Sequence, residues 1–371
     1  MAITKVTTPV TGFESPVDIG LKIPVGTNSN LPTGVEGMIR NDTDEDSGGA
    51  NSTTAITFYN GTDWKYFTST ASPVLINVDY LVVAGGGGGG GSQQVGYGGG
   101  AGGGAGGLRT SFGSTSGGGT SAESYIQGIV NTNYTVTIGT GGTGAPLSTN
   151  NRGTNGTDSV FSAITSKGGG GGGNYGQIAA NGQGLTGGSG GGSSRDYNGG
   201  AALTSLVVMG FAGGDASYSA VGGAGGGGAG AVGLISYSSS GGVKVGGDGG
   251  AGLQSSITVA SGNGTYYAGG GAGGTFGASS FTGSGGSGVG GDGGAEYINA
   301  GTGDVNTGSG GGGAGNYSRQ GANGGSGIVV LRYPAEYNMT VGSGLILGST
   351  NTYGVDKVSI FIGGTGTVSF N

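Results

Sequence analysis

The side chains that could do chemistry are few, and the absent types exclude whole classes of site. Cysteine and histidine do not occur among the 371 residues. This excludes Ser-His-Asp and Cys-His catalysis, zinc sites of thiolate or imidazole ligands, and disulfide bonds. Paired carboxylates could still cleave glycosidic bonds, but only eight acidic residues are scattered over residues 85–327. We therefore expect no enzyme activity and no cofactor.

The densest acidic group lies near the N-terminus, in the segment NDTDEDSGG. Asp42, Asp44, Glu45 and Asp46 resemble the start of a calcium loop, where alternate carboxylates converge on a hard cation. The twelfth position of such a loop, counted from Asp42, is Thr53 and not the glutamate that an EF-hand needs. We favour a solvated acidic turn and expect no metal site.

Tyrosine and arginine recur in the polar segments between glycine runs, where recognition chemistry could lie. Flat rings can stack on a partner, and short polar groups beside them can form adaptable hydrogen bonds. The alternative is that the tyrosines pack over the flanks of the glycine region. The candidate recognition residues are Tyr175, Tyr197, Tyr218, Tyr266, Tyr267, Tyr317, Arg195 and Arg319.

The elements that position these loops must be built mainly from glycine. Of 104 glycines, 89 fall within residues 85–327, a composition that is typical of disordered linkers. A collagen helix is excluded, because the glycines come in pairs and longer runs and Pro146 is the only proline there. Polyglycine II coils have three residues per turn and leave every N–H and C=O free to bond neighbouring coils. The sequence therefore predicts packed polyglycine II helices.

This packing predicts where side chains are allowed. A coil surrounded on all sides needs glycine on every face, whereas a coil at the rim can carry a side chain on one face in three. The heptapeptide VGGDGGA occurs at residues 245–251 and again at 289–295. We interpret Asp248 and Asp292 as rim positions of two related helices.

Segments rich in β-branched residues punctuate the glycine runs and predict strands. The first enters the glycine region and the last leaves it, so we expect these two to pair. The fold class is mainly β and non-regular, with an N-terminal β module at residues 1–76, a glycine-rich domain at 77–334 and a C-terminal β hairpin or meander at 335–371. The predicted strands are residues 79–84, 134–138, 159–164, 205–211, 256–260 and 327–333.

The strings DYLVVAGGGGGGG, YTVTIGTGG and GGSGIVVLRY, in this order, resemble the glycine-rich domains of bacteriophage tail-fibre and other virion appendage proteins. GMIRND followed by ITFYNGTDWKYF resembles a hairpin found in many phage tail proteins, with a tight turn at Asn60-Gly61 and Trp64 as its anchor. The resemblance implies a polyglycine II sandwich whose loops contact a host receptor. The runs here are less even, and a further C-terminal segment follows them.

The resemblance leads us to expect a virion protein, either a tail fibre or a receptor-binding adhesin for host attachment. Its expected partners are two further copies in a homotrimer, other virion proteins through the N-terminal module, and a host saccharide or protein. The net charge of −7 argues against nucleic-acid binding. No apolar stretch predicts membrane insertion or a signal peptide.

Two other functions fit the same sequence. One is a capsid head fibre or decoration protein whose glycine-rich domain is a spacer. The other is a glycine-rich protein of a bacterial surface or matrix, which the missing secretion signal disfavours.

Overall fold

The computed structural model describes residues 25–26, 39–42, 55–59, 61–62, 64–66, 73–92, 98–147, 150–176, 179–203, 207–217, 221–238, 244–259, 264–276, 282–316 and 319–371. The chain forms two compact units, Met1–Ser72 and Pro73–Asn371. The sequence placed this boundary a few residues later, at 76, but residues 75 and 76 already belong to the first strand of the second unit.

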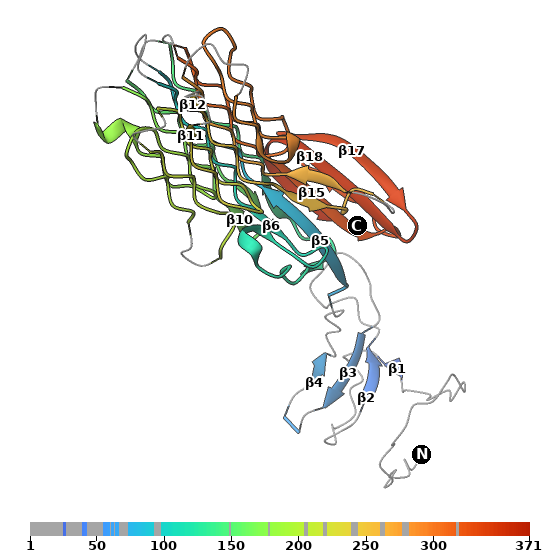
Figure 1. The fold of residues 1–371 in the computed structure, drawn as a ribbon. Helices are drawn as coiled ribbons and strands as arrows, with labels where there is room; N and C mark the ends of the chain where they lie inside the picture. The colour runs from blue at the N-terminus through green and yellow to red at the C-terminus, as the bar shows by residue number, and fades with distance from the viewer. Residues whose placement is uncertain are drawn as a thin grey trace. The chain divides into compact units, whose positions relative to one another are not determined.

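The described part is mainly β and non-regular, as expected, and its helices are short 3₁₀ segments (Figure 1). These helices are Gly117–Gly119, Ala179–Gly182 and Gly286–Gly288. The strands are β1 Val25–Gly26, β2 Ile39–Asp42, β3 Ala55–Tyr59, β4 Trp64–Tyr66, β5 Leu75–Val83, β6 Leu108–Thr110, β7 Ile126–Ile129, β8 Tyr134–Thr137, β9 Ser159–Phe161, β10 Ile164–Ser166, β11 Tyr237–Ser238, β12 Lys244–Val245, β13 Leu253–Ser255, β14 Thr265–Tyr267, β15 Ile328–Pro334, β16 Met339–Val341, β17 Leu345–Tyr353 and β18 Asp356–Phe370.

The first unit holds a small sheet in the order β1-β2-β3-β4. β3 and β4 pair antiparallel, with Tyr59 opposite Trp64, which confirms the predicted hairpin. Asp42 ends β2, whereas Asp44, Glu45 and Asp46 lie outside the described residues, as does the side chain of Trp64.

The second unit is closed by one large antiparallel sheet. β5 enters the glycine region and β15 leaves it, and the two pair from Ile328–Val83 to Arg332–Asp79, as predicted. β18 pairs with β15 on one side and, further along, with β8. Residues 335–371 form the predicted β hairpin, with β17 antiparallel to β18. Because β18 also pairs with β15, this hairpin belongs to the same sheet as the strands that border the glycine-rich region and is not a separate module.

Two of the predicted strands do not form. The described residues of 205–211 are irregular, and the Met209 carbonyl accepts the amide of Leu108 at 3.0 Å. Residues 256–259 form a turn after β13. In both segments, side chains that favour strands instead cover the ends of glycine runs. Ile257 is fully buried there and belongs to an apolar cluster with Tyr267.

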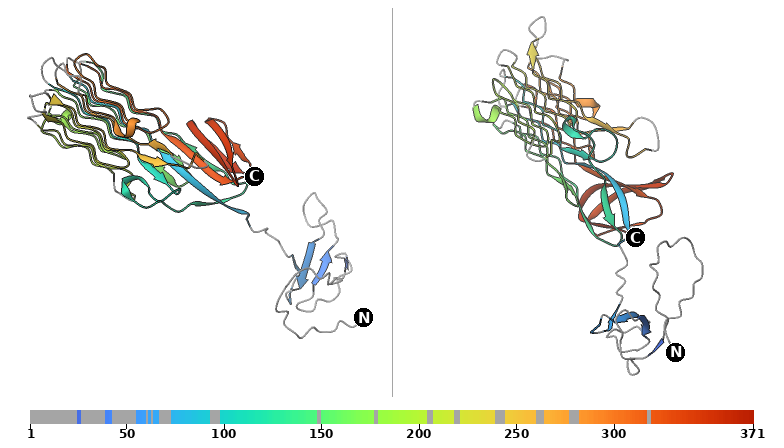
Figure 2. Two further views of the ribbon diagram at one scale, coloured as in Figure 1. Left: turned by 45° about the vertical axis from the view of Figure 1, so that its right-hand side comes forward. Right: turned by 90° about the horizontal axis from the view of Figure 1, so that it is seen from below.

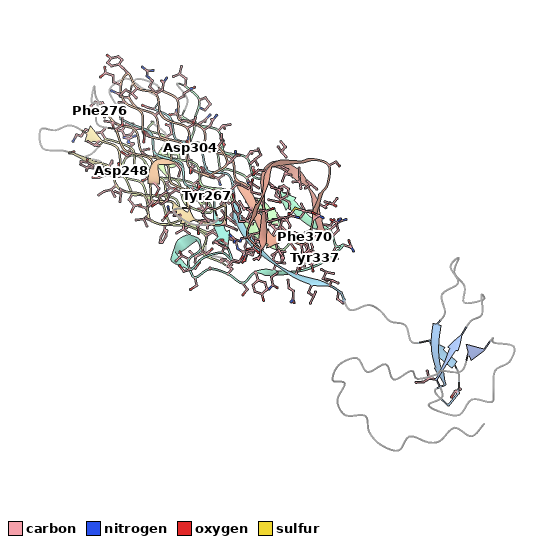
Figure 3. The ribbon with its side chains drawn as sticks, turned by 90° about the vertical axis from the view of Figure 1, so that its right-hand side faces the viewer. Asp248, Tyr267, Phe276, Asp304, Tyr337 and Phe370 are labelled. Carbon is pink, nitrogen blue, oxygen red and sulfur yellow. The ribbon has the colours of Figure 1, made fainter. Side chains whose placement is uncertain are left out.

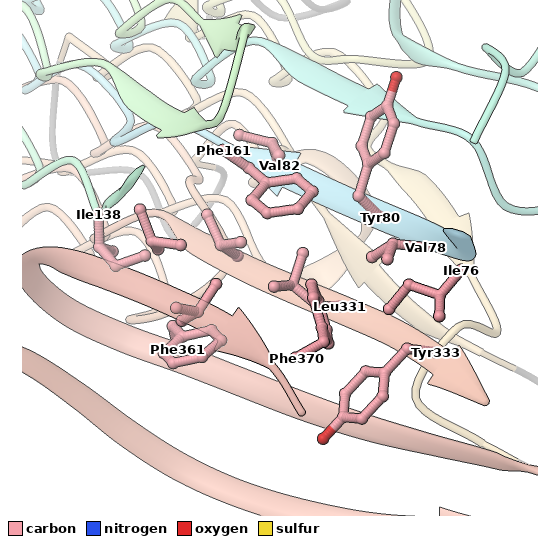
Figure 4. Packing of buried hydrophobic residues seen from close by; sticks show 13 residues of the cluster. Ile76, Val78, Tyr80, Val82, Ile138, Phe161, Leu331, Tyr333, Phe361 and Phe370 are labelled. Carbon is pink, nitrogen blue, oxygen red and sulfur yellow. The ribbon is translucent and has the colours of Figure 1, made fainter. Parts of the chain in front are cut away.

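Two apolar clusters lie on the two faces of this sheet. The first is rich in aromatic rings and includes Tyr80, Phe161, Phe361 and Phe370 (Figure 4). The edge of the Tyr333 ring meets Phe370, with centroids 5.1 Å apart. The second cluster contains Leu81, Val83, Val330 and Val358 and is covered by the β13–β14 hairpin. Ordinary side-chain burial therefore stabilises this end of the unit.

A polar network borders the first cluster. The hydroxyl of Tyr80 donates to Glu123 at 2.9 Å, and Arg109 Nε donates to the same carboxylate at 2.8 Å. Burial, followed by the neighbouring Glu123 charge, raises the pKa of Tyr80 above its ordinary value. Burial also raises the pKa of Tyr267 and of Tyr333.

Raising the pH above about 10, the ordinary tyrosine pKa, is expected to destabilise the second unit. Because these tyrosines ionise less readily when folded, their stabilisation is complete below the unfolded-state pKa and is lost as the pH rises through the folded-state pKa. Urea unfolding over an alkaline pH series measures this loss. Tyr80→Phe, which has no hydroxyl to ionise, should show a shallower fall than the parent. A free energy of unfolding that stays constant up to about pH 12 would contradict this.

The glycine runs lie side by side and bond laterally (Figure 2). Residues 85–90 show the pattern completely, with a period of three and N···O distances of 2.8–3.0 Å. Their amides donate from Gly85 and Gly88 to Thr157 and Thr154, from Gly86 and Gly89 to Gly325 and Ala322, and from Gly87 and Gly90 to Gly104 and Ala101. Their carbonyls accept from Gly169 and Gly172, from Gly142 and Ala145, and from Gly311 and Ala314. This run thus bonds to six neighbours, as polyglycine II packing requires.

The same packing explains why interior positions are glycine. A Cβ added at Gly87 would lie 2.2 Å from the carbonyl oxygen of Gly170, and one added at Gly103 would lie 2.1 Å from that of Gly87. Both obstacles are backbone atoms of neighbouring runs, which cannot turn aside as a flexible side chain can. Any side chain here would force two runs apart and break their lateral hydrogen bonds.

At the edge of the array, side-chain oxygens accept amide hydrogen bonds in place of carbonyls. The two copies of VGGDGGA bond to adjacent amides of one short run. Asp248 Oδ1 accepts from Ser284 N at 2.7 Å, and Asp292 Oδ1 accepts from Gly285 N at 2.8 Å. Both aspartates are exposed, which confirms that they are rim positions. The remaining caps of this kind include Asp158 on Gly168, Asn155 on Gly171, Asn323 on Gly144 and Asp215 on Gly199.

Candidate functional site: the turns at the distal end of the glycine array

The runs alternate in direction, so the connections between them gather at two ends. The run after β5 begins beside the sheet, and the next run returns to β6 and pairs with the first antiparallel. We call the two ends the sheet end and the distal end. In Figure 3, Phe276 marks the distal end, and Phe370 in β18 and Tyr337 in the turn after β15 lie at the opposite end of this unit. Followed through the hydrogen-bond register, the runs enter and leave the distal end at residues 92 and 98, 146 and 152, 174 and 182, 194 and 198, 215 and 221, 236 and 245, 276 and 283, 295 and 299, and 316 and 320, and each connection is named below by these two described residues.

This alternation separates the residues predicted from the sequence. Tyr175, Tyr197, Arg195 and Arg319 belong to distal connections. Tyr266 and Tyr267 lie in β14, whose hairpin with β13 is at the sheet end. Tyr218 and Tyr317 lie outside the described residues. The predicted set is thus divided between two opposite ends and is not one site.

Burial divides the set further. Tyr267 is 4% exposed and belongs to the second apolar cluster, and Tyr175 is 7% exposed. For these two residues the alternative that tyrosines pack against the glycine region holds, so we keep neither among the residues proposed to contact a partner. Tyr266 is 42% exposed, but it faces solvent at the sheet end.

Arg195 holds two distal connections together. Its Nη1 donates to the carbonyl of Gly176 at 2.9 Å, and its guanidinium lies over the ring of Tyr175 at 5.5 Å from the centroid. The neighbouring Ser194 Oγ donates to the carbonyl of Asn174 at 2.6 Å. These bonds join residues 194–198 to residues 174–182, so Arg195 positions the turns and its charge is already engaged.

Arg319 plays the same part elsewhere on the distal end. Its Nη1 donates to Asn299 Oδ1 and its Nη2 to the carbonyl of Glu296, both at 3.1 Å. Its own carbonyl accepts the amide of Ser92 at 3.3 Å. Arg319 therefore fixes connection 316–320 against 295–299 and 92–98. Both predicted arginines shape the distal surface from within.

The most exposed large side chains of this surface were missed by the sequence interpretation. Tyr297 is 77% exposed, Leu147 59%, Tyr237 53% and Ile298 47%. All four lie in distal connections, where aromatic and branched side chains can contact a partner over a wide area. One signal in the sequence could have found them, because successive connections alternate between the two ends. Counting the runs from β5 places 236–245 and 295–299 with the distal group.

The described residues contain no group of three or more Asp and Glu side chains arranged to bind a metal ion. Within the same ranges, no helix is long and apolar enough to cross a membrane.

The family comparison agrees with the fold. A family described as a glycine-rich domain matches residues 61–334, from the β3–β4 hairpin to the last residue of β15. A search of curated proteins finds no match. The match covers more than half of the 371 residues and includes every glycine run described above. By this match and by the laterally bonded runs that it contains, the chain belongs to the glycine-rich domain family.

Proposed function

We propose that this chain is a non-enzymatic bacteriophage virion protein, a tail fibre or receptor-binding adhesin that attaches the particle to its host. In this proposal the first unit binds other virion proteins, and the distal surface of the glycine array contacts a saccharide or protein of the host. The protein assembles in the host cytoplasm and acts as part of the virion.

One observation carries the proposal. The array brings connections that are far apart in the sequence to one end, and it holds them there through rigid, laterally bonded runs. Arg195 and Arg319 tie neighbouring connections together, and large side chains such as Tyr297 and Tyr237 are exposed in the distal connections. Loops that vary on a rigid scaffold are the usual form of a recognition surface. The phage resemblance of the sequence supplies the partner class.

Removing the two exposed distal tyrosines together, Tyr237→Ala with Tyr297→Ala, is expected to lower adsorption to the host by about tenfold or more. Such rings contribute most to an interface when they are exposed beforehand and buried on contact. The measurement is the adsorption rate of particles that carry the variant. Tyr266→Ala is the matched control, because this tyrosine is exposed at the sheet end. Adsorption by the control should equal that of the parent.

A decoration protein would give the opposite result. Both variants would then adsorb normally, and the loss would appear in particle stability. Immunolabelling of intact particles separates the two functions directly, since an adhesin lies at the tail and a decoration protein on the capsid. Equal adsorption by all variants, or label confined to the capsid, would overturn the adhesin.

We also propose that the protein acts as a homotrimer, because a chain with few apolar side chains gains burial by sharing interfaces. Sedimentation equilibrium of the purified chain tests this. A stable monomer would contradict the trimer without affecting the distal surface.

A further inference from the structure

Asn-Gly pairs occur in the described part of the glycine array at residues 155–156, 181–182, 198–199 and 323–324. In such a pair the glycine nitrogen can attack the side-chain carbon of asparagine, because glycine has no Cβ to hinder the approach. The attack requires that the glycine amide lose its proton. The group that accepts this N–H therefore decides how reactive each pair is.

At two of the four pairs, 155–156 and 323–324, the acceptors are neutral carbonyls. The amide of Gly156 donates to Gly169 O at 3.0 Å, and that of Gly324 donates to Gly142 O at 2.9 Å. A carbonyl oxygen cannot take the proton, and its bond holds the nitrogen in the packed run. Asn155 and Asn323 are also fixed, since their Oδ1 atoms accept amides of neighbouring runs. At 181–182, Asn181 Nδ2 donates to the carbonyl of Asn150 at 2.6 Å.

The pair at 198–199 has a different acceptor. The amide of Gly199 donates to Asp215 Oδ1 at 2.7 Å. This distance is within the range in which a general base removes a proton. Asn198 and Asp215 are both exposed, so water can reach them. No hydrogen bond restrains the Asn198 side chain among the described residues.

We propose that Asn198 is a site of self-catalysed deamidation, with Asp215 as the general base. The Gly199 nitrogen forms a bond to Asn198 Cγ while its proton passes to the Asp215 carboxylate. The Cγ–Nδ2 bond then breaks, and the proton leaves with ammonia, which restores the carboxylate. Water opens the resulting cyclic imide and gives aspartate or isoaspartate. No atom other than those of water is added, and nothing is oxidised or reduced.

The product changes the distal surface. Residues 194–198 form one of its connections, and they gain a negative charge close to Asp196. The isoaspartate form also lengthens the main chain by one carbon just before the run that starts at Gly199. The charge of the surface would thus depend on the age of the protein. The chemistry does not require that the surface bind a host.

The experiment incubates the purified full-length chain at neutral pH and physiological temperature and follows each Asn-Gly pair by peptide mass spectrometry. Within one wild-type molecule, Asn198 should convert at least about tenfold faster than Asn155 and Asn323, which a general base of ordinary efficiency would easily supply. This internal comparison requires no variant. Asp215→Asn keeps a hydrogen-bond acceptor but removes the base, and it should slow Asn198 to the rate of the other two sites. Asp196→Asn is the control and should leave the rate unchanged.

Three results would overturn the proposal. The first is equal conversion of Asn198, Asn155 and Asn323 in the wild-type chain. The second is conversion of Asn198 that is unchanged in Asp215→Asn. The third is faster conversion in that variant, which would mean that the bond from Gly199 to Asp215 protects the pair.

Discussion

Gly103→Ala is expected to lower the free energy of unfolding of the glycine-rich unit by about 4 kcal/mol. The new methyl group would lie 2.1 Å from the carbonyl oxygen of Gly87. Overpacking costs about 1–3 kcal/mol by itself. The bonds from Gly103 N to Gly311 O and from Gly271 N to Gly103 O are also lost or stretched as the runs separate, at about 1 kcal/mol each. Urea unfolding followed by tyrosine fluorescence measures the change.

Ala101→Gly is the matched control for this variant. Ala101 lies in the same run and is fully buried, but its methyl group already has a place in the packing. Removing it costs the burial of one methyl group and some backbone entropy, about 1–2 kcal/mol in sum. Gly103→Ala should therefore be clearly the more damaging exchange. Equal effects of the two exchanges would mean that the runs are not packed as tightly as their bonds indicate.

How far the sequence predicts the fold depends on which interactions decide each element. The pairing of β5 with β15 was predictable, because both strands are rich in β-branched and other apolar residues and they border the glycine region. The rim positions of Asp248 and Asp292 followed from the period of three. The strand predictions for residues 205–211 and 256–260 were wrong, because β-branched side chains can also pack over the end of a glycine run, as Ile257 does. Composition cannot distinguish these two uses of the same residues.

The candidate site was harder to predict, because it depends on the direction of each run. Tyr266 and Tyr197 stand in similar polar segments, and nothing local shows that they face opposite ends. The lateral bonds decide it, and those join residues far apart in the sequence, such as Gly144 with Asn323. The placement of Arg195 over Tyr175 was equally beyond the sequence, since it arises between two separate connections.

The second large effect concerns the main chain itself. The lateral bonds continue from run to run across the array, from Gly226 N to Gly271 O, from Gly271 N to Gly103 O, from Gly103 N to Gly311 O and from Gly311 N to Gly87 O. Chains of hydrogen bonds polarise one another, and water does not reach these buried groups. Breaking one bond requires that several runs separate. We therefore expect the amides in this series of hydrogen bonds to exchange with solvent only when the unit opens as a whole.

Hydrogen exchange of the full-length protein, resolved to single amides, tests most directly whether lateral main-chain bonding holds this fold together. We predict that the amides of Gly87, Gly103, Gly271 and Gly311 exchange at least about a thousandfold more slowly than those of free peptides. Their protection should equal that of the paired amides of β5 and β15. Exchange of these glycine amides at the rate of an unstructured chain, while the amides of β5 and β15 stay protected, would contradict the conclusion that lateral main-chain bonding holds the fold together.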